Sequence, residues 1–263
     1  MTAAMDISWS DLALIFTTLL IPLGVSRYYQ LKIERELIIS VCRMALQLIL
    51  VGIYLEYLFQ LNNLPINILW LLAMLLIGAS SIVSKAHLPK SKLLLPVIVG
   101  LSVGLLPLLA LICLFIVRPT PFYNAQYLIP LAGMLLGNSL SGNIVALQNV
   151  FNSFEQRRAE YEGAISLGAP VNYACQPFIR EAIQKSLAPS LASMSTMGLV
   201  TLPGMMTGQI LGGASPLVAI KYQLMIMLAI FVMLSISIAL TLSLTIRCCI
   251  DKNGLILVVA NKK

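Results

Sequence analysis

The feature that most limits the fold of this chain is a series of seven apolar segments, each near the roughly 20 residues that a helix needs to cross a bilayer. In hydrocarbon every backbone N–H and C=O group must find its partner inside the protein, and a helix provides that partner. The sequence therefore predicts an all-α, polytopic integral membrane protein with about seven transmembrane helices. The segments lie at about 9–26, 37–59, 67–84, 93–117, 126–148, 187–211 and 217–246.

The composition agrees with this class, because 59% of the residues are hydrophobic and only 10% are charged. A soluble domain would expose far more charge. The spans leave no room for a separate soluble domain, so we expect residues 1–263 to form a single transmembrane domain. The first segment has neither a basic start nor a clear cleavage site, so it is expected to be retained as a span.

The basic residues indicate how the chain is oriented. Fifteen of the 17 lysine and arginine residues fall on one side of the predicted membrane, and only Arg118 and Lys221 fall on the other. The positive-inside rule then places the N-terminus outside and the C-terminus in the cytoplasm, across the inner (plasma) membrane and in contact with its lipid. The net charge of +7 is thus a topology signal and does not indicate nucleic-acid binding. The predicted cytoplasmic segments are 27–36, 85–92, 149–186 and 247–263, and the predicted outer loops are 60–66 and 118–125.

One long polar segment, at about 149–186, interrupts the apolar chain. Its first part, Phe151 to Leu167, is rich in helix-forming residues. Gly168 suits a left-handed helix end, and Pro170 suits the first turn of a new helix. The segment therefore predicts a helix, a sharp turn and a second helix on the cytoplasmic side.

Within this segment the spacing E-G-A-x-x-x-G-A, from Glu162 to Ala169, resembles the cytoplasmic coupling motif E-A-A-x-x-x-G of ATP-binding cassette permeases. In that family the motif docks into a groove of the ATPase subunit. Gly163 departs from the alanine of the general motif, which loosens a helix there. The resemblance implies ATPase contacts from Glu162, Gly163, Ala164, Leu167, Gly168 and Ala169.

Three stretches resemble the FetB-type permeases, a family assigned to iron export with plant relatives linked to aluminium tolerance. They are Ala164–Ala169, Gly198–Gly208 and Ala219–Gln223. The resemblance implies a permease subunit that exports iron or a related metal species. It also implies a homodimer of fourteen spans working with two copies of a cytoplasmic ATPase.

The sequence lacks the residues for catalysis of its own. It has no G-x-x-x-x-G-K-[ST] phosphate loop, no H-E-x-x-H and no nucleophile elbow. We therefore expect this chain to be a transport subunit that binds no cofactor, with ATP and Mg²⁺ held by the partner ATPase.

Two spans carry most of the candidate pathway residues. The segment 126–148 has small residues four apart at Gly133, Gly137 and Ser141, which favours close helix packing. It also carries amides that either join helices or line a pathway. The segment 187–211 is interrupted at Thr201–Gly204, and transporters often place substrate sites at such interruptions. Its methionines are either soft metal ligands or flexible packing.

A third candidate set lies in the second span, where Arg43 and Gln47 are one helical turn apart. Arg43 either snorkels to the interface or takes part in transport. The predicted pathway set is Arg43, Gln47, Asn138, Ser139, Asn143, Met194, Met197, Thr201, Pro203, Met205, Met206 and Gln209.

The substrate and the class of transporter stay open at this point. Free iron prefers oxygen or nitrogen ligands, and the spans offer few charged ones, so the sequence identifies no metal ligands. A metal chelate or a small organic solute fits the mostly neutral spans equally well. An ion-driven secondary transporter or channel is the alternative of another class, and it predicts inverted repeats or intramembrane acidic residues, which are not evident.

Overall fold

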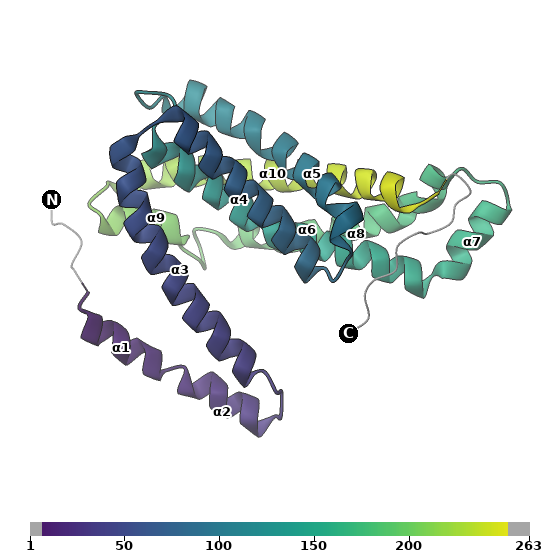
Figure 1. Cartoon of the computed structure of the whole chain (residues 1–263), viewed down its shortest axis with the longest axis horizontal. Helices are drawn as coiled ribbons and strands as arrows, with labels where there is room; N and C mark the ends of the chain where they lie inside the picture. Colours follow the sequence, from purple (N-terminus) through teal and green to yellow (C-terminus); the bar gives the residue numbers. More distant parts are fainter. Residues whose placement is uncertain (1–6, 252–263) are drawn as a thin grey trace.

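The computed structural model describes residues 7–251, and in that range the chain is helical with no strand beyond an isolated bridge between Met197 and Thr201 (Figure 1). The predicted cytoplasmic segment 247–263 extends beyond the described residues, and three of its basic residues lie outside them: Lys252, Lys262 and Lys263. The helices are α1 (Trp9–Thr17), α2 (Leu20–Tyr28), α3 (Glu34–Leu61), α4 (Leu64–Lys85), α5 (Lys90–Leu111) with a π-helical continuation (Ile112–Val117), α6 (Ala125–Gln156), α7 (Arg158–Ser166), α8 (Val171–Thr196), α9 (Gly204–Leu211) and α10 (Pro216–Cys249).

The body of the molecule forms around α10, which packs mainly against α5 and α6. Its buried side chains include Met233 and Leu242, both fully inaccessible to solvent. Small residues allow the close approach, because a Cβ at Gly100 would lie 2.9 Å from the carbonyl oxygen of Ser237 and would also collide with Thr241. Gly142 of α6 lies equally tightly against α10, whereas the predicted packing residue Gly137 faces open space.

Six stretches in the described part of the chain are long and apolar enough to cross a membrane. They correspond to the predicted spans except the one at 187–211, which is not a single helix. Its first residues belong to α8, which begins at Val171 in the polar segment, and its last residues form α9. Between the two lies the irregular stretch 197–203. Figure 1 shows α8 and α9 returning the chain along the body, opposite in direction to α6 and α10. This passage is therefore polar at one end and discontinuous at the other.

An N-terminal arm, α1 to α3, lies apart from the body (Figure 1). Only one α3 residue, Leu58, is buried. The arm is held at the α3–α4 turn, where the Asn62 side chain accepts a 3.0 Å hydrogen bond from the Ala125 backbone N–H. Nearby, Asn67 donates a 2.8 Å bond to the carbonyl of Tyr123. From this anchored end α3 diverges from α4, and a groove opens between them.

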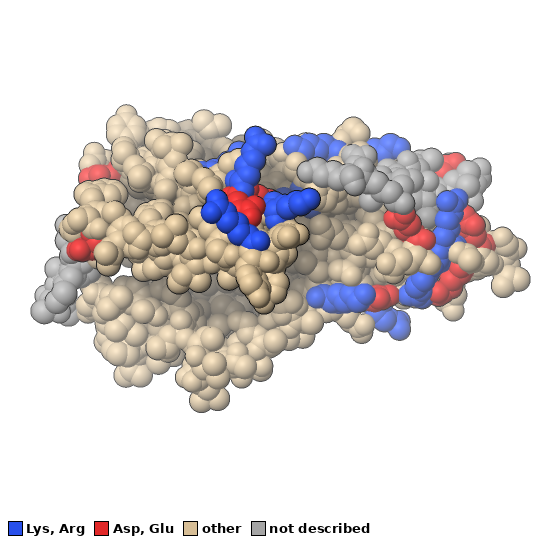
Figure 2. Space-filling model, turned by 90° about the horizontal axis from the view of Figure 1, so that it is seen from below, with Lys and Arg blue, Asp and Glu red and all other residues tan. Residues whose placement is uncertain are grey.

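At the opposite end, α6 and α10 are longer than a membrane requires. Their 32 and 34 residues correspond to about 48 and 51 Å of helix, against about 30 Å of hydrocarbon. The surplus length carries α7 beyond the α4–α5 turn (Figure 1). Figure 2 shows basic and acidic side chains gathered near the α2–α3 turn and the α7 end, while the other end of this face is mostly uncharged.

Candidate functional site

The first candidate site is the α7–α8 hairpin. The prediction of one helix over 151–167 was wrong, because α6 ends at Gln156 and Arg157 leaves helical geometry (φ −115°, ψ 35°). The predicted turn is confirmed: Gly168 has φ +85°, and its N–H donates a 2.9 Å bond to the carbonyl of Ile165. Pro170 caps α8 instead of occupying its first turn. Such a left-handed glycine satisfies the terminal carbonyls of α7 and reverses the chain.

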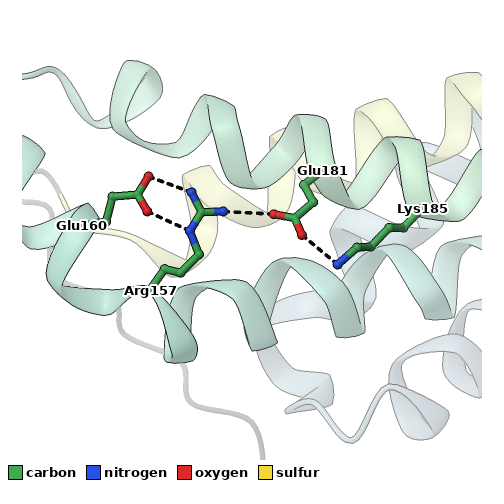
Figure 3. A network of polar contacts seen from close by, with 4 residues as sticks. All are labelled: Arg157, Glu160, Glu181 and Lys185. Carbon is green, nitrogen blue, oxygen red and sulfur yellow. Dashed lines mark hydrogen bonds and ion pairs between the residues drawn. The ribbon is translucent and has the colours of Figure 1, made fainter.

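Ion pairs fix α7 against α8 (Figure 3). Arg157 donates from Nε and Nη2 to the two carboxylate oxygens of Glu160, both at 2.7 Å, and from Nη1 to Glu181 of α8 at 3.0 Å. Lys185 completes the network with a 2.7 Å contact to Glu181. The hydrogen bond from Arg157 lowers the pKa of Glu160, and Lys185 and then Arg157 lower the pKa of Glu181. The network therefore holds both carboxylates ionised at neutral pH.

A small aromatic core lies beneath these charges. The rings of Phe154 and Phe178 stack with centroids 4.6 Å apart, and Tyr161 meets Phe154 edge-on at 5.4 Å. Arg157 lies 4.9 Å from the centre of the Phe178 ring. Burial raises the pKa of Tyr161 to about 12 and that of Cys175 to about 11, so both stay protonated. The core joins α6, α7 and α8 into one packed unit.

The tip of the hairpin is the part that is free to meet another molecule. Four of the predicted coupling residues are exposed: Glu162, Gly163, Leu167 and Gly168. The other two, Ala164 and Ala169, are half-buried. Leu167 is 91% exposed, and Tyr173 in the first turn of α8 is 68% exposed. Sequence reasoning missed Tyr173, although an aromatic residue just after the turn of a polar segment was a usable signal. The tip thus offers apolar side chains within a charged surface.

The second candidate site is a cavity of about 410 Å³ on the face formed by α6, α8, α9 and α10. It contains five of the predicted pathway residues, and the break in the helical passage forms one wall. In that break Gly198 has φ +86°, and its N–H donates a 2.9 Å bond to the carbonyl of Thr201. The lining is Met134, Asn138, Ser193, Met197, Thr201, Pro203, Gly204, Met205, Gln223, Ile226, Met227 and Ile230.

The cavity lining is neutral and rich in thioethers and amides. Asn138 donates 2.8 Å to the carbonyl of Met134, so one amide oxygen stays available to the cavity. Gln223 lies with its Nε2 4.0 Å from the sulfur of Met197, and its buried Oε1 accepts no hydrogen bond within the described part of the chain. A cavity of this kind suits a neutral or partly desolvated guest that brings its own hydrogen-bond donor. Residues 7–251 contain no group of three or more histidine, cysteine, aspartate or glutamate side chains placed to hold a metal ion.

Other predicted pathway residues lie elsewhere. Ser139 and Asn143 are fully buried, and Asn143 donates 2.9 Å bonds to the Ser139 carbonyl and to Ser237 of α10. Asn143 therefore joins α6 to α10, whereas the Ser139 hydroxyl donates to the Leu135 carbonyl within α6. Both residues fit the packing alternative. Met194, Met206 and Gln209 are outside the cavity lining, while Arg43 and Gln47 line the separate groove between α3 and α4.

Sequence reasoning missed the cavity residues Met134, Gln223 and Met227. Met134 lies one helical turn before Asn138, and Gln223 and Met227 lie one turn apart on α10, so helical spacing carried a signal. The spacing did not predict that α10 packs beside α6, and this packing brings the two sets of residues together.

Comparison with known proteins places this geometry in a family. The model of the uncharacterised protein family UPF0014 matches residues 9–250. The chain belongs to the UPF0014 family. It is 34% identical over 230 residues to the UPF0014 membrane protein slr1647 of Synechocystis, covering 87% of this chain and 88% of the relative. No solved structure matches the chain.

Two further UPF0014 relatives carry names that describe a role. The probable iron export permease protein FetB of Escherichia coli is 31% identical over 225 residues, which is 84% of each chain. Protein ALUMINUM SENSITIVE 3 of Arabidopsis thaliana is 35% identical over 216 residues, or 82% of this chain and 77% of the relative. The predicted family is thereby confirmed, and the chain is a membrane permease.

Proposed function

We propose that this chain is the permease subunit of an ATP-binding cassette exporter of iron or a related metal species, with the α7–α8 hairpin as its ATPase-docking element. The observation that carries the proposal is the hairpin tip, where Leu167 is 91% exposed on a rigid charged support beyond the membrane-spanning length of α6. An apolar side chain presented in this way fits a groove on a soluble partner. ATP and Mg²⁺ belong to that partner in this proposal.

The hairpin is connected to both walls of the cavity. The aromatic core ties α7 to the end of α6 and to the first half of α8. Asn138 lies further along α6, and Met197 and the break lie at the far end of α8; both residues line the cavity. A displacement at Leu167 would therefore move two cavity walls together, because packed helices transmit shifts as rigid bodies.

The irregular stretch 197–203 favours the proposal that the chain forms a homodimer. Leu199 and Val200 are 91% and 79% exposed in an irregular stretch within a helical passage. Irregular backbone at membrane depth is tolerated only where protein covers it or where it lines a water-filled cavity. A homodimer whose two cavities meet at the shared axis meets both conditions. The proposed orientation has the N-terminus outside and the hairpin in the cytoplasm of the inner (plasma) membrane, following the positive-inside rule.

The neutral lining bears on the substrate. The name of the Escherichia coli relative supports iron as the substrate. The thioethers of Met197 and Met205 are soft ligands and suit a softer metal species better than free iron. The absence of a carboxylate from the cavity lining favours a metal chelate or a small organic solute as the second candidate. It also disfavours an ion-driven transporter, which needs an acidic residue near its site.

Co-purification from native membranes tests the proposal. A wild-type chain should bring down a P-loop ATPase, and Leu167→Asp should lose it, because a charge replaces the exposed apolar contact. Leu31→Asp is the matched control, since Leu31 is also exposed, at 50%, in the α2–α3 turn. Retention of the ATPase by Leu167→Asp, together with unchanged metal efflux, would refute the docking role.

A further inference from the structure

The groove between α3 and α4 is not explained by the transport proposal. It has a volume of about 720 Å³ and opens where α3 diverges from the body (Figure 1). One wall carries Arg43 and Gln47 of α3. The other wall carries three hydroxyls and a cation of α4, with apolar residues further along; these are Ser80, Ser81, Ser84, Lys85, Leu76 and Ile77.

The depth of Arg43 makes the groove unusual. Arg43 lies nine positions beyond Glu34, the first residue of α3 (43 − 34 = 9), which is about 14 Å along the helix axis. A guanidinium at this level is costly unless water or an anion reaches it. No ion pair involves Arg43 among residues 7–251, and no carboxylate lines the groove.

The opposite wall adds positive charge and hydrogen-bond donors. Lys85 ends α4, and Lys90 reaches back from the start of α5 to donate a 3.1 Å bond to the Ser80 hydroxyl. Ser81 is half-buried beside it. Two cations and three hydroxyls therefore line the groove, a third cation bonds one of those hydroxyls, and no carboxylate of the described residues lines it. Such a set attracts an anion with several acceptor oxygens.

We propose that this groove binds the phosphodiester headgroup of an anionic phospholipid. The guanidinium of Arg43 can meet two phosphate oxygens at once, and the α4 hydroxyls can donate to the others. Leu76 and Ile77, exposed by 51% and 70%, continue the groove as an apolar surface for the acyl chains. A free phosphate would use the polar half alone, whereas a phospholipid uses both halves.

The bound lipid would fill the groove between α3 and α4. The C-terminal part of α3 is anchored to the body, through the Asn62 bond and the stacking of Tyr54 on Trp70. A ligand that bridges Arg43 and Lys85, closer to the free end of α3, would therefore set the angle of the arm. The assignment is independent of any ATPase, so its test is separate from that of the proposed function.

Binding to the purified full-length chain decides the matter. Phosphatidylglycerol added in detergent should raise the midpoint of thermal unfolding, and phosphatidylcholine should not. Arg43→Gln should weaken phosphatidylglycerol binding about tenfold, because one charge-assisted contact is lost. Arg118→Gln is the matched control, as it removes an arginine whose Nε instead bonds the carbonyl of Phe115 at the other end of the molecule. Ser81→Ala, a milder change that leaves the charge in place, should weaken binding less.

Three results would overturn the assignment. Equal phosphatidylglycerol affinity in wild type, Arg43→Gln and Ser81→Ala would show that the groove is not the site. An equal rise in unfolding midpoint with inorganic phosphate would replace the lipid with a soluble anion. Efficient disulfide formation between two copies of Ser81→Cys in membranes would show that protein covers the groove.

Discussion

Arg157, the residue between α6 and α7, donates two hydrogen bonds of 2.7 Å to the carboxylate of Glu160. The same guanidinium reaches Glu181 on α8, so a single side chain spans the base of the hairpin (Figure 3). The arrangement sets the direction in which Leu167 projects. The ion pairs at the base of the hairpin therefore hold α7 against α8.

Arg157→Gln is the first variant to test. It removes the contacts to Glu160 and Glu181 but leaves the aromatic core, so the chain should fold and insert with little loss of stability, because ion pairs that water reaches contribute little. ATP hydrolysis by the assembled transporter should become poorly coupled to efflux, because the tip is no longer held. Arg158→Gln is the control, since among residues 7–251 Arg158 pairs along α7 with Glu162 and with no residue of α8. Equal coupling ratios in the two variants would contradict the positioning role.

Acid should loosen the hairpin. The pKa values of Glu160 and Glu181 are lowered in the folded chain, by hydrogen bonds from Arg157 and Lys185 respectively. A lowered folded-state pKa gives stability that is present above the ordinary carboxyl value of about 4.3 and is lost as the pH falls through the folded value. The hairpin should therefore stay fixed from neutral pH down to about 5 and loosen progressively as the pH falls below the ordinary carboxyl value. A fluorophore on Leu167→Cys would report the change, and Arg157→Gln should show greater mobility already at neutral pH.

The turn at Gly168 gives a prediction based on backbone geometry. At φ +85° a β-branched residue is strained, so Gly168→Val should reorient the tip and uncouple transport. Gly163→Ala is the control within the same helix, because a Cβ there meets nothing within 4 Å. Alanine should stabilise α7 by up to about 1 kcal/mol and preserve coupling. ATP hydrolysis and efflux are measured on both variants. Equal coupling in the valine and alanine variants would contradict the role given to the positive φ of Gly168.

Local signals predicted much of this molecule. Runs of apolar residues predicted most spans. Gly168 marked the turn because glycine adopts positive φ without strain, and Pro203 marked the break because proline fixes φ and lacks a backbone N–H. The end of α6 at Arg157 has no such residue, and it depends on ion pairs with a neighbouring helix. The start of a second helix near Pro170 was predicted, but its continuation into the segment 187–211 was not, because hydropathy does not show whether a polar helix and an apolar one form a single helix.

Neighbouring residues also have different roles that sequence could not separate. Asn138 and Ser139 are adjacent, yet the first lines the cavity and the second is buried against the bundle. Successive helical residues point about 100° apart, so only the packing of α10 decides which of them faces the cavity. Arg43 was likewise predicted to belong to the pathway, because no feature of the nearby sequence shows that α3 diverges from the body.

Met205→Leu tests whether the cavity carries the substrate. The change nearly conserves volume, so stability should fall by less than about 1.5 kcal/mol. If the thioether contacts a metal species, efflux should drop while ATPase binding stays normal. Met233→Leu is the matched control, because Met233 is fully buried in α10 and is not part of the cavity lining. Unchanged efflux in Met205→Leu would limit Met205 to packing.

Two asparagines of α6 should separate transport from stability. Asn138 is exposed to the cavity, and within the described part of the chain its amide bonds the carbonyl of Met134 in its own helix and no other helix. Asn138→Leu should therefore leave folding nearly intact and change efflux or its substrate profile. Asn143 is buried and donates to Ser237 of α10. Asn143→Leu removes this bond between α6 and α10, while the Ser237 hydroxyl keeps its donation to the Leu234 carbonyl, so the change should cost about 1 kcal/mol. Thermal unfolding and metal efflux measured on both variants check the pair. The cavity on α6 is not the pathway if Asn138→Leu transports like the wild type, and the packing role of Asn143 fails if its leucine variant unfolds no earlier.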